Sequence, residues 1–256
     1  MAAYDIIGNI AIVKFRRGVG VMEKKKFALR FLREHNSVRT VLEKSEKFSG
    51  RLRTLKTKFI AGEKTLDALY KENGCTFRLN VESCYFSPRL SSERLEIAKM
   101  IKKGERVLVM FAGVAPFPIV IAKFSQAGKI WSVELGRECS KYAEQNLKLN
   151  KISNIVLIQG DVRKKVPKLK QKFDRIVMAR PNLKDSFLDV AFPFVKRGGI
   201  IHYYGFYSET DVQKMIEMIQ KEASRAKKKI KIFGIKKAGD IGVRKFRYRV
   251  DLKVLN

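Results

Sequence analysis

The sequence predicts an α/β protein whose main sheet is mostly parallel, preceded by a small α+β module. From Ser91 onward, short apolar runs alternate with segments of helical pattern. A loop of small residues follows the first of these runs, and an acidic residue ends the second. Such alternation is typical of a sheet that carries helices on both faces.

The small module is predicted to span residues 1–83, which are rich in Lys and Arg. Gly8-Asn9 separates two apolar runs within Ile6–Lys14 and indicates the start of a β-rich segment. Glu23–His35 has the pattern of a basic amphipathic helix. Two further strands are expected at Val38–Leu42 and Thr76–Val81.

The larger domain, in which helices and strands alternate, is predicted to span residues 84–256. Strands are expected at Val107–Phe111, Lys129–Val133, Ile155–Gln159, Arg175–Ala179 and Gly199–Tyr204. Helices are expected at Leu95–Ile101, Pro116–Ser125, Glu138–Asn150, Asp185–Val195 and Glu209–Ser224. The tail differs, because Lys231–Lys236 and the alternating run Phe246–Val254 predict a hairpin added to the sheet edge.

The first strand and the loop after it predict a nucleotide-binding turn. The run Val107–Phe111 ends in the small residues of Ala112–Pro116, and an apolar helical segment follows. Small residues let a ligand approach the backbone, and a new helix offers unpaired N–H groups there. Glu134 ends the next strand about 20 residues later, where such folds place the acceptor for ribose hydroxyls.

Ligands of a doubly wound sheet bind at the carboxyl ends of its strands, where four loops should meet. These loops are Ala112–Pro116, Glu134–Gly136, Gly160–Arg163 and Ala179–Asn182. Asp161 is placed to accept from the exocyclic amine of an adenine, although it also suits a cap of the following turn. Pro181 stiffens the fourth loop and presents polar neighbours to the cleft.

Composition indicates a polyanionic partner and a reducing compartment. Lys and Arg number 55 against 25 Asp and Glu, a formal net charge of +30, which favours nucleic acid as the partner. The candidate RNA contacts are Arg51–Lys58 and Arg225–Lys231. The three cysteines lack metal-ligand spacing and are expected to be buried thiols. Without a signal peptide or a long apolar run, a soluble cytoplasmic protein is expected.

The loops contain no Ser-His-Asp set, no metal cluster and no phosphate-binding loop of the nucleoside-triphosphatase type. Only two histidines occur, and His202 lies in an apolar strand, where a structural role is favoured. Nucleophilic and metal chemistry are therefore not expected, and group transfer from an adenosine cofactor is left.

Several motifs together resemble the archaeal and eukaryotic tRNA guanine-N1 methyltransferases that act at position 37. The most specific is Tyr85–Arg94, YFSPRLSSER, followed by MFAGVAPF. Further matches, in the same order along nearly the whole chain, are IIGNIAIV near the start, Arg53-Thr54, Asn146–Asn150, Gly160–Arg163 and GGIIHYY at Gly198–Tyr204. The resemblance implies a class I S-adenosylmethionine-dependent methyltransferase domain, Rossmann-like in fold.

The resemblance also implies roles for individual residues. Glu93 would be the base that removes the guanine N1 proton, and Arg53 would stabilise the charge that grows on O6. The flanking Arg89 and Arg94 favour an ionised Glu93. The residues expected at the cofactor are Tyr85, Arg94, Phe111, Ala112, Gly113, Val114, Ala115, Glu134, Leu135, Asp161, Val162 and Ala179. Those expected at the substrate base are Arg89, Arg180, Pro181 and Asn182.

Simpler interpretations of the two catalytic candidates stay open. Glu93 also suits the first turn of a helix, where the dipole favours a carboxylate. Arg53 also suits a phosphate contact.

The chain departs from the family pattern in four places. The resemblance begins at the family's middle domain, so an anticodon stem-loop is expected to serve nearly as well as whole tRNA. Val109 replaces an acidic residue and Ala115 replaces a glycine of the turn. Ala179-Arg180-Pro181 replaces Asn-Leu-Pro, which removes an amide expected to hold the guanine.

Three functions follow from the resemblance. Methyl transfer to guanine N1 leads, because RLSSER and Pro181 keep the methyltransferase form. The first alternative is aminocarboxypropyl transfer from the same cofactor to a wyosine precursor, the reaction of related wybutosine-pathway enzymes. The second is a tRNA-binding relative without catalysis, which Val109, Ala115 and Ala179 motivate. The partner is tRNA in each case, and a monomer is expected.

Overall fold

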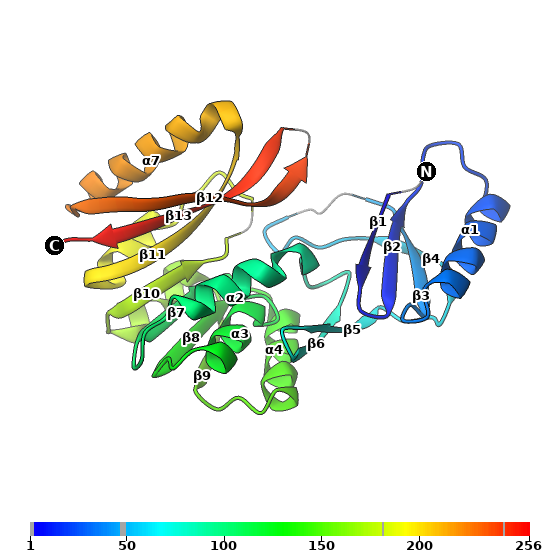
Figure 1. Cartoon of the computed structure of the whole chain (residues 1–256), viewed down its shortest axis with the longest axis horizontal. Coiled ribbons are helices and arrows are strands. Elements are labelled where there is room, and N and C mark those ends of the chain that lie inside the picture. Colours follow the sequence, from blue (N-terminus) through cyan, green and yellow to red (C-terminus); the bar gives the residue numbers. More distant parts are fainter. Residues whose placement is uncertain (1–2, 47–49, 181, 243) are drawn as a thin grey trace.

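The computed structural model describes residues 3–46, 50–180, 182–242 and 244–256. It has two lobes, a small amino-terminal one and a larger one built on a seven-stranded sheet (Figure 1). The prediction of an α/β fold with a parallel-rich sheet is confirmed. The predicted domain boundary after residue 83 stays a prediction.

The small lobe is a four-stranded sheet with one helix. Its strands are β1 (Ala3–Ile7), β2 (Ile10–Lys14), β3 (Thr40–Lys44) and β4 (Thr57–Gly62), and the helix is α1 (Val21–Glu34). Strands β2 and β3 run parallel, with α1 as the crossover, and the other pairs are antiparallel. The helix lies on one face of the sheet, where Ala28 and Phe31 join the apolar residues of β2 and β3.

A hairpin of β5 (Asp67–Glu72) and β6 (Cys75–Asn80) links the two lobes. The β1–β2 turn lies against it, and a Cβ added to Gly8 would fall 2.0 Å from the carbonyl oxygen of Leu69. Since Gly8 also has φ +58°, both the close approach and the backbone conformation require glycine.

The other side of the hairpin is held by two asparagine side chains of α4 (Arg137–Leu149) and its end. Asn146 accepts from the N–H of Arg78 at 2.7 Å and donates to its carbonyl at 3.0 Å. One helical turn later, Asn150 accepts from the N–H of Thr76 at 2.8 Å and donates to its carbonyl at 2.7 Å. The two amides therefore pair with the edge of β6 as a neighbouring strand would.

The large sheet has the order β12-β13-β11-β10-β7-β8-β9. The five strands from β11 to β9 run parallel, and β13 and β12 are added antiparallel at one edge. The predicted carboxy-terminal hairpin is thus confirmed. The bounds are β7 (Arg106–Met110), β8 (Lys129–Glu134), β9 (Ile155–Gln159), β10 (Phe173–Met178), β11 (Val195–Ser208), β12 (Ile230–Gly242) and β13 (Lys245–Val254).

Helices cover both faces of this sheet. On one face lie α2 (Ser91–Lys99), α3 (Pro116–Phe124) and α4, packed on the odd-numbered side chains of β7. On the other face lie α5 (Val162–Lys165), α6 (Leu188–Ala191) and α7 (Val212–Arg225), packed on the even-numbered ones. The long β12–β13 hairpin extends toward the small lobe (Figure 1).

The helix predicted at Asp185–Val195 is wrong in extent, because only the four residues of α6 are α-helical. The guanidinium of Arg180 donates to the carbonyls of Leu183 and Asp185, and Phe187 has a left-handed backbone, φ +59°. Both features hold the segment before α6 in a loop, and Pro193 limits helix after it.

A chain of charged and polar side chains runs through the large sheet. Arg175 pairs with Glu105 and contacts the His202 ring, whose other nitrogen lies 2.7 Å from Asp251. Asp251 in turn pairs with Arg249 at 3.0 Å. His202 is fully buried, and burial lowers its pKa despite the carboxylate. The predicted buried thiols are confirmed, since all three cysteines are buried and free.

Candidate active site

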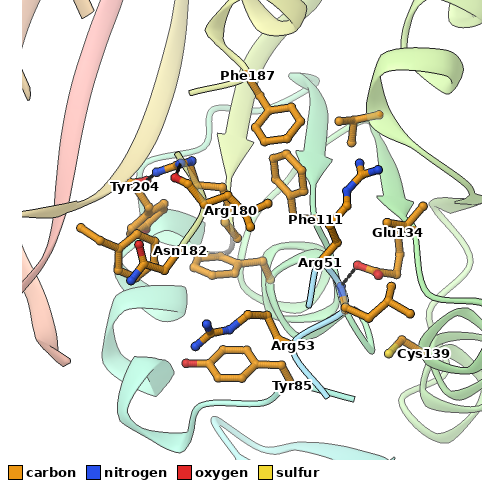
Figure 2. Close-up of a pocket in the computed structure, with 18 of the residues that line it drawn as sticks. Arg51, Arg53, Tyr85, Phe111, Glu134, Cys139, Arg180, Asn182, Phe187 and Tyr204 are labelled. Carbon is orange, nitrogen blue, oxygen red and sulfur yellow. Dashed lines mark hydrogen bonds between the residues drawn. The ribbon is translucent and has the colours of Figure 1, made fainter. Parts of the chain in front are cut away.

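One pocket lies at the carboxyl ends of the parallel strands, where the lobes meet (Figure 2). Glu134 and Cys139 lie at one side of it, Tyr204 and Asn182 at the other, and Arg53 lies over the Tyr85 ring. Of the predicted residues, those that line the pocket are Arg53, Tyr85, Phe111, Gly113, Glu134, Leu135, Asp161, Val162, Ala179, Arg180 and Asn182.

The turn after β7 forms one wall of the pocket. Phe111 and Gly113 have positive φ, 62° and 58°, and Gly113 brings its backbone to the pocket surface. Ala112, Val114 and Ala115 lie behind it, with exposed fractions of 4% or less. Ala115 has φ +66° and precedes α3, so it holds the conformation that the family's glycine would adopt freely.

Glu134 fixes this turn from the end of β8. Its carboxylate accepts from the N–H of Gly113 and from the N–H of Gly136, each at 2.7 Å. Burial raises the pKa of the Glu134 carboxyl, and the two N–H donors oppose that rise. The Glu134 side chain therefore connects the turn after β7 to the loop after β8 and still borders the pocket.

Asp161 is paired with the small lobe. Its carboxylate accepts from Arg51 at 2.7 Å and from the N–H of Arg163 at 2.9 Å. Burial alone would raise the pKa of Asp161, but these hydrogen bonds bring it below its usual value. Arg51 belongs to the segment before β4, so the small lobe contributes part of the pocket wall.

The opposite end of the pocket is cationic and aromatic. The Arg53 guanidinium lies 5.6 Å from the centre of the Tyr85 ring, and Arg247 donates to the Tyr85 hydroxyl at 3.2 Å. Arg247 also lies 5.2 Å from the centre of the Phe206 ring. Ile241, at the end of β12, adds an apolar side chain. These groups suit a planar base, which stacks on rings and guanidinium planes.

The fourth loop is organised by Arg180. Two of its nitrogens donate to main-chain carbonyls, and its Nε is buried without a hydrogen-bond partner among the described residues. Asn182 lines the pocket beside it, whereas Pro181 lies outside the described residues. Ala179, at the start of the loop, leaves room where a larger residue would fill the pocket.

Glu93 does not line the pocket but lies one hydrogen bond behind it. The hydroxyl of Tyr204, a pocket residue, donates to Glu93 Oε1 at 2.7 Å. Arg249 donates to the same oxygen at 2.6 Å, and the Lys236 Nζ lies 3.6 Å from the other. Glu93 itself is 5% exposed.

The arginines that flank Glu93 in the sequence point elsewhere. Arg94 makes a buried two-pronged ion pair with Glu72 and is 1% exposed, and this pair ties α2 to the end of β5. Arg89 pairs with Asp5 of the small lobe. The cations beside Glu93 are instead Arg249 and Lys236, which lie far from it in the sequence.

Among the described residues, no three His, Cys, Asp or Glu side chains gather as metal ligands. No helix in the described ranges is long and apolar enough to cross a membrane. The basic segment Arg225–Lys231 runs from the end of α7 into the start of β12, and none of these described residues lines the pocket (Figure 1). Its predicted contact with RNA stays a prediction.

The sequence matches the TRM5/TYW2 methyltransferase domain over residues 68–232 and the TYW2 N-terminal domain over residues 1–65. The chain belongs to the TRM5/TYW2 methyltransferase family. It is 36% identical to the tRNA (guanine(37)-N(1))-methyltransferase Trm5b of Pyrococcus abyssi, over 98% of this chain and 74% of the relative. It is 34% identical to the tRNA (guanine(37)-N(1))/4-demethylwyosine(37)-methyltransferase Taw22 of Nanoarchaeum equitans, over 99% of this chain and all of the relative.

Solved structures agree with this assignment to the TRM5/TYW2 family. The crystal structure of Pyrococcus abyssi Trm5b has a TM-score of 0.89 at 36% identity, over 99% of this chain and 75% of that one. A complex of aTrm5 with tRNALeu has a TM-score of 0.87 at 28% identity, over 99% of this chain and 72% of that one. The expected class I fold is thereby confirmed.

Sequence reasoning about this TRM5/TYW2 member missed the side chains that β11 and β13 bring to the site. Tyr204, Phe206, Arg247 and Arg249 lie in the two strands β11 and β13, 111 residues or more after Glu93 in the sequence. One signal was present, because FRYRVDLKV places two arginines on alternate positions of a strand expected at the sheet edge. Tyr204 also lay within the quoted GGIIHYY motif.

Proposed function

We propose that this protein transfers a methyl group from S-adenosylmethionine to N1 of guanine 37 in tRNA. The observation that supports this most is the composition of the single pocket described above. One end of the pocket is the turn after β7, held by Glu134, and such a turn suits an adenosine cofactor. The other end is the cationic and aromatic group of side chains around Tyr85. The named activities of the two relatives above are consistent with this arrangement.

The cofactor half rests on three groups. Glu134 would accept from the ribose hydroxyls, and the backbone at Gly113 would face the methionine part. Asp161 would accept from the adenine amine, for which it must exchange its contact with Arg51. When bound, S-adenosylmethionine supplies an electrophilic methyl group on a positively charged sulfur.

The base half rests on cations and rings. A guanine that leaves its stack would lie among Tyr85, Phe206 and Arg53. Arg53 would stabilise the negative charge that develops on O6 as N1 loses its proton. The buried Nε of Arg180 is a donor without a partner in the described part of the chain, and it would replace the amide that Ala179 lacks.

The RNA itself would bind across the small lobe. Arg51 and Arg53 lie at the pocket rim, and Lys24, Lys25 and Lys26 lie on α1 of the same lobe. Phosphate contacts by such residues release counterions, so binding should weaken steeply with salt. We propose that the protein acts on the anticodon stem-loop as a cytoplasmic monomer.

One incubation tests this function and separates it from the alternatives. The protein is mixed with S-adenosylmethionine and an anticodon stem-loop carrying guanine 37, and nucleosides and by-products are measured by mass spectrometry. We expect 1-methylguanosine and S-adenosylhomocysteine, and neither from the same RNA with adenine at position 37. Methylthioadenosine as the sole by-product would establish aminocarboxypropyl transfer. Cofactor binding without any product would establish a binding protein.

A tricyclic wyosine precursor is the second candidate substrate at the same position. Ala179 is small where the family pattern has asparagine, and Ile241 and Leu52 add apolar surface to the pocket. The Taw22 relative is named for both guanine and 4-demethylwyosine. The same incubation with an RNA carrying that base would reveal either transfer by a gain in nucleoside mass.

A further inference from the structure

Tyr204 separates the carboxylate of Glu93 from the pocket. The tyrosine lines the pocket, and its ring centre lies 5.9 Å from that of Phe117. Its hydroxyl donates to Glu93 Oε1 at 2.7 Å (Tyr204 is labelled in Figure 2). A base in the pocket would therefore meet the tyrosine before it meets the carboxylate.

Glu93 is fixed in this position from behind. Arg249 donates to it at 2.6 Å and to Glu96 at 2.7 Å, and it pairs with Asp251 at 3.0 Å. Arg249 is 4% exposed, so moving Glu93 into the pocket would remove one of the anions that balance a buried cation. The Glu93 carboxylate is therefore held behind Tyr204, and a proton that comes from the pocket would reach it through that tyrosine.

We propose that Tyr204 takes the N1 proton of the target base and passes its own hydroxyl proton to Glu93; this rests on the proposed methyl transfer to guanine N1. As the N1–H bond breaks, its proton bonds to the Tyr204 oxygen, and the tyrosine proton bonds to Glu93 Oε1. The N1 electron pair forms the bond to the methyl carbon. The carbon–sulfur bond breaks with its electrons on sulfur, which leaves S-adenosylhomocysteine, methylated guanine and protonated Glu93.

The chemistry of the tyrosine suits a concerted transfer. Burial and the neighbouring carboxylate raise the pKa of Tyr204 well above its ordinary value, so its resting form is the neutral hydroxyl. A neutral hydroxyl that already donates to a carboxylate can accept one proton while it releases another. No tyrosinate has to form, and the net result is proton transfer from the base to Glu93.

A double-mutant cycle on single-turnover rates tests the relay. Tyr204→Phe removes only the hydroxyl, and we expect a loss of about 100-fold or more, in the range of general-base catalysis, with the cofactor dissociation constant unchanged. Glu93→Gln should cost a similar factor, and the double variant should be no slower than Glu93→Gln alone, because the two act in one step. Tyr248→Phe is the matched control, since Tyr248 lies on β13 beside Arg249 and its buried hydroxyl has no partner among the described residues.

Tyr204→Phe at the wild-type rate would overturn the relay while leaving the proposed function intact. Independent losses that multiply in the double variant would also overturn it. A wild-type protein that makes no 1-methylguanosine would overturn both.

A second measurement uses the wild-type protein and so does not depend on how a variant folds. Single-turnover rates are taken in mixtures of light and heavy water. Two protons in flight give a curve that bows downward with the heavy-water fraction. A straight line, which one moving proton gives, would assign proton removal to a single group and overturn the relay.

Discussion

Replacing Asn146 by alanine should destabilise the protein much more than the same change at Asn150. Asn146 is fully buried and makes three hydrogen bonds, to the N–H and carbonyl of Arg78 and to the carbonyl of Val114 at 3.0 Å. The alanine variant removes the side-chain partner of all three backbone groups at a position that is itself fully buried. At about 1 to 1.5 kcal/mol for each, the free energy of unfolding should fall by roughly 3 to 4 kcal/mol.

Asn150 provides the matched comparison. It makes the same pair of bonds to Thr76, but it is partly exposed, so water can replace the amide. Asn150→Ala should cost about 1 kcal/mol. Urea unfolding followed by circular dichroism measures both values. Equal losses, or a loss below about 1 kcal/mol for Asn146→Ala, would refute the reasoning.

The two variants should also differ in cofactor binding. The carbonyl of Val114 belongs to the turn after β7, so Asn146→Ala should loosen that turn and weaken the affinity for S-adenosylmethionine. Asn150→Ala should leave the affinity unchanged, because its bonds lie away from the pocket. Calorimetry on the folded variants measures this difference.

Three further predictions concern the pocket. In the proposed site, ribose hydroxyls would donate to an ionised Glu134, so the affinity for S-adenosylmethionine should fall as the pH drops through the raised pKa of this carboxyl. A pH-independent affinity in wild type, or the same fall in Glu134→Gln, would contradict the assignment. Arg51→Ala should raise cofactor affinity by up to about five-fold by freeing Asp161, the scale of an exposed ion pair, and a weaker affinity would show that Arg51 assists the cofactor instead. Ala179→Asn should raise turnover on guanine and lower it on a tricyclic base, which steady-state rates on the two RNAs would decide.

The fold was predictable where short stretches of sequence decide it. The alternation of apolar runs and helices predicted the parallel strands, and Glu134 was found because its partner, the turn after β7, lies 21 residues before it. The helix after β10 was overestimated, because Arg180 binds the carbonyls of that segment and no local pattern reveals such bonds.

The candidate site was predictable only in part, because some of its residues lie far apart in the sequence. Glu93 was identified by its motif, but its partners Tyr204 and Arg249 lie 111 and 156 residues away. Their meeting depends on the order of strands β11 and β13 in the sheet. No spacing rule links residues that only sheet topology brings together.

The contribution of Arg51 and Arg53 to the pocket wall limits how freely this protein could be recombined. A chimera that keeps residues 66–256 and takes its first 65 residues from a relative would receive a foreign wall in the pocket, beside the proposed adenine site. If RNA binds across the small lobe as proposed, changing this lobe would change cofactor affinity as well as RNA binding, and the two properties would have to be optimised together. Cofactor affinity measured on such chimeras would report how well the two lobes fit each other, without any RNA being present.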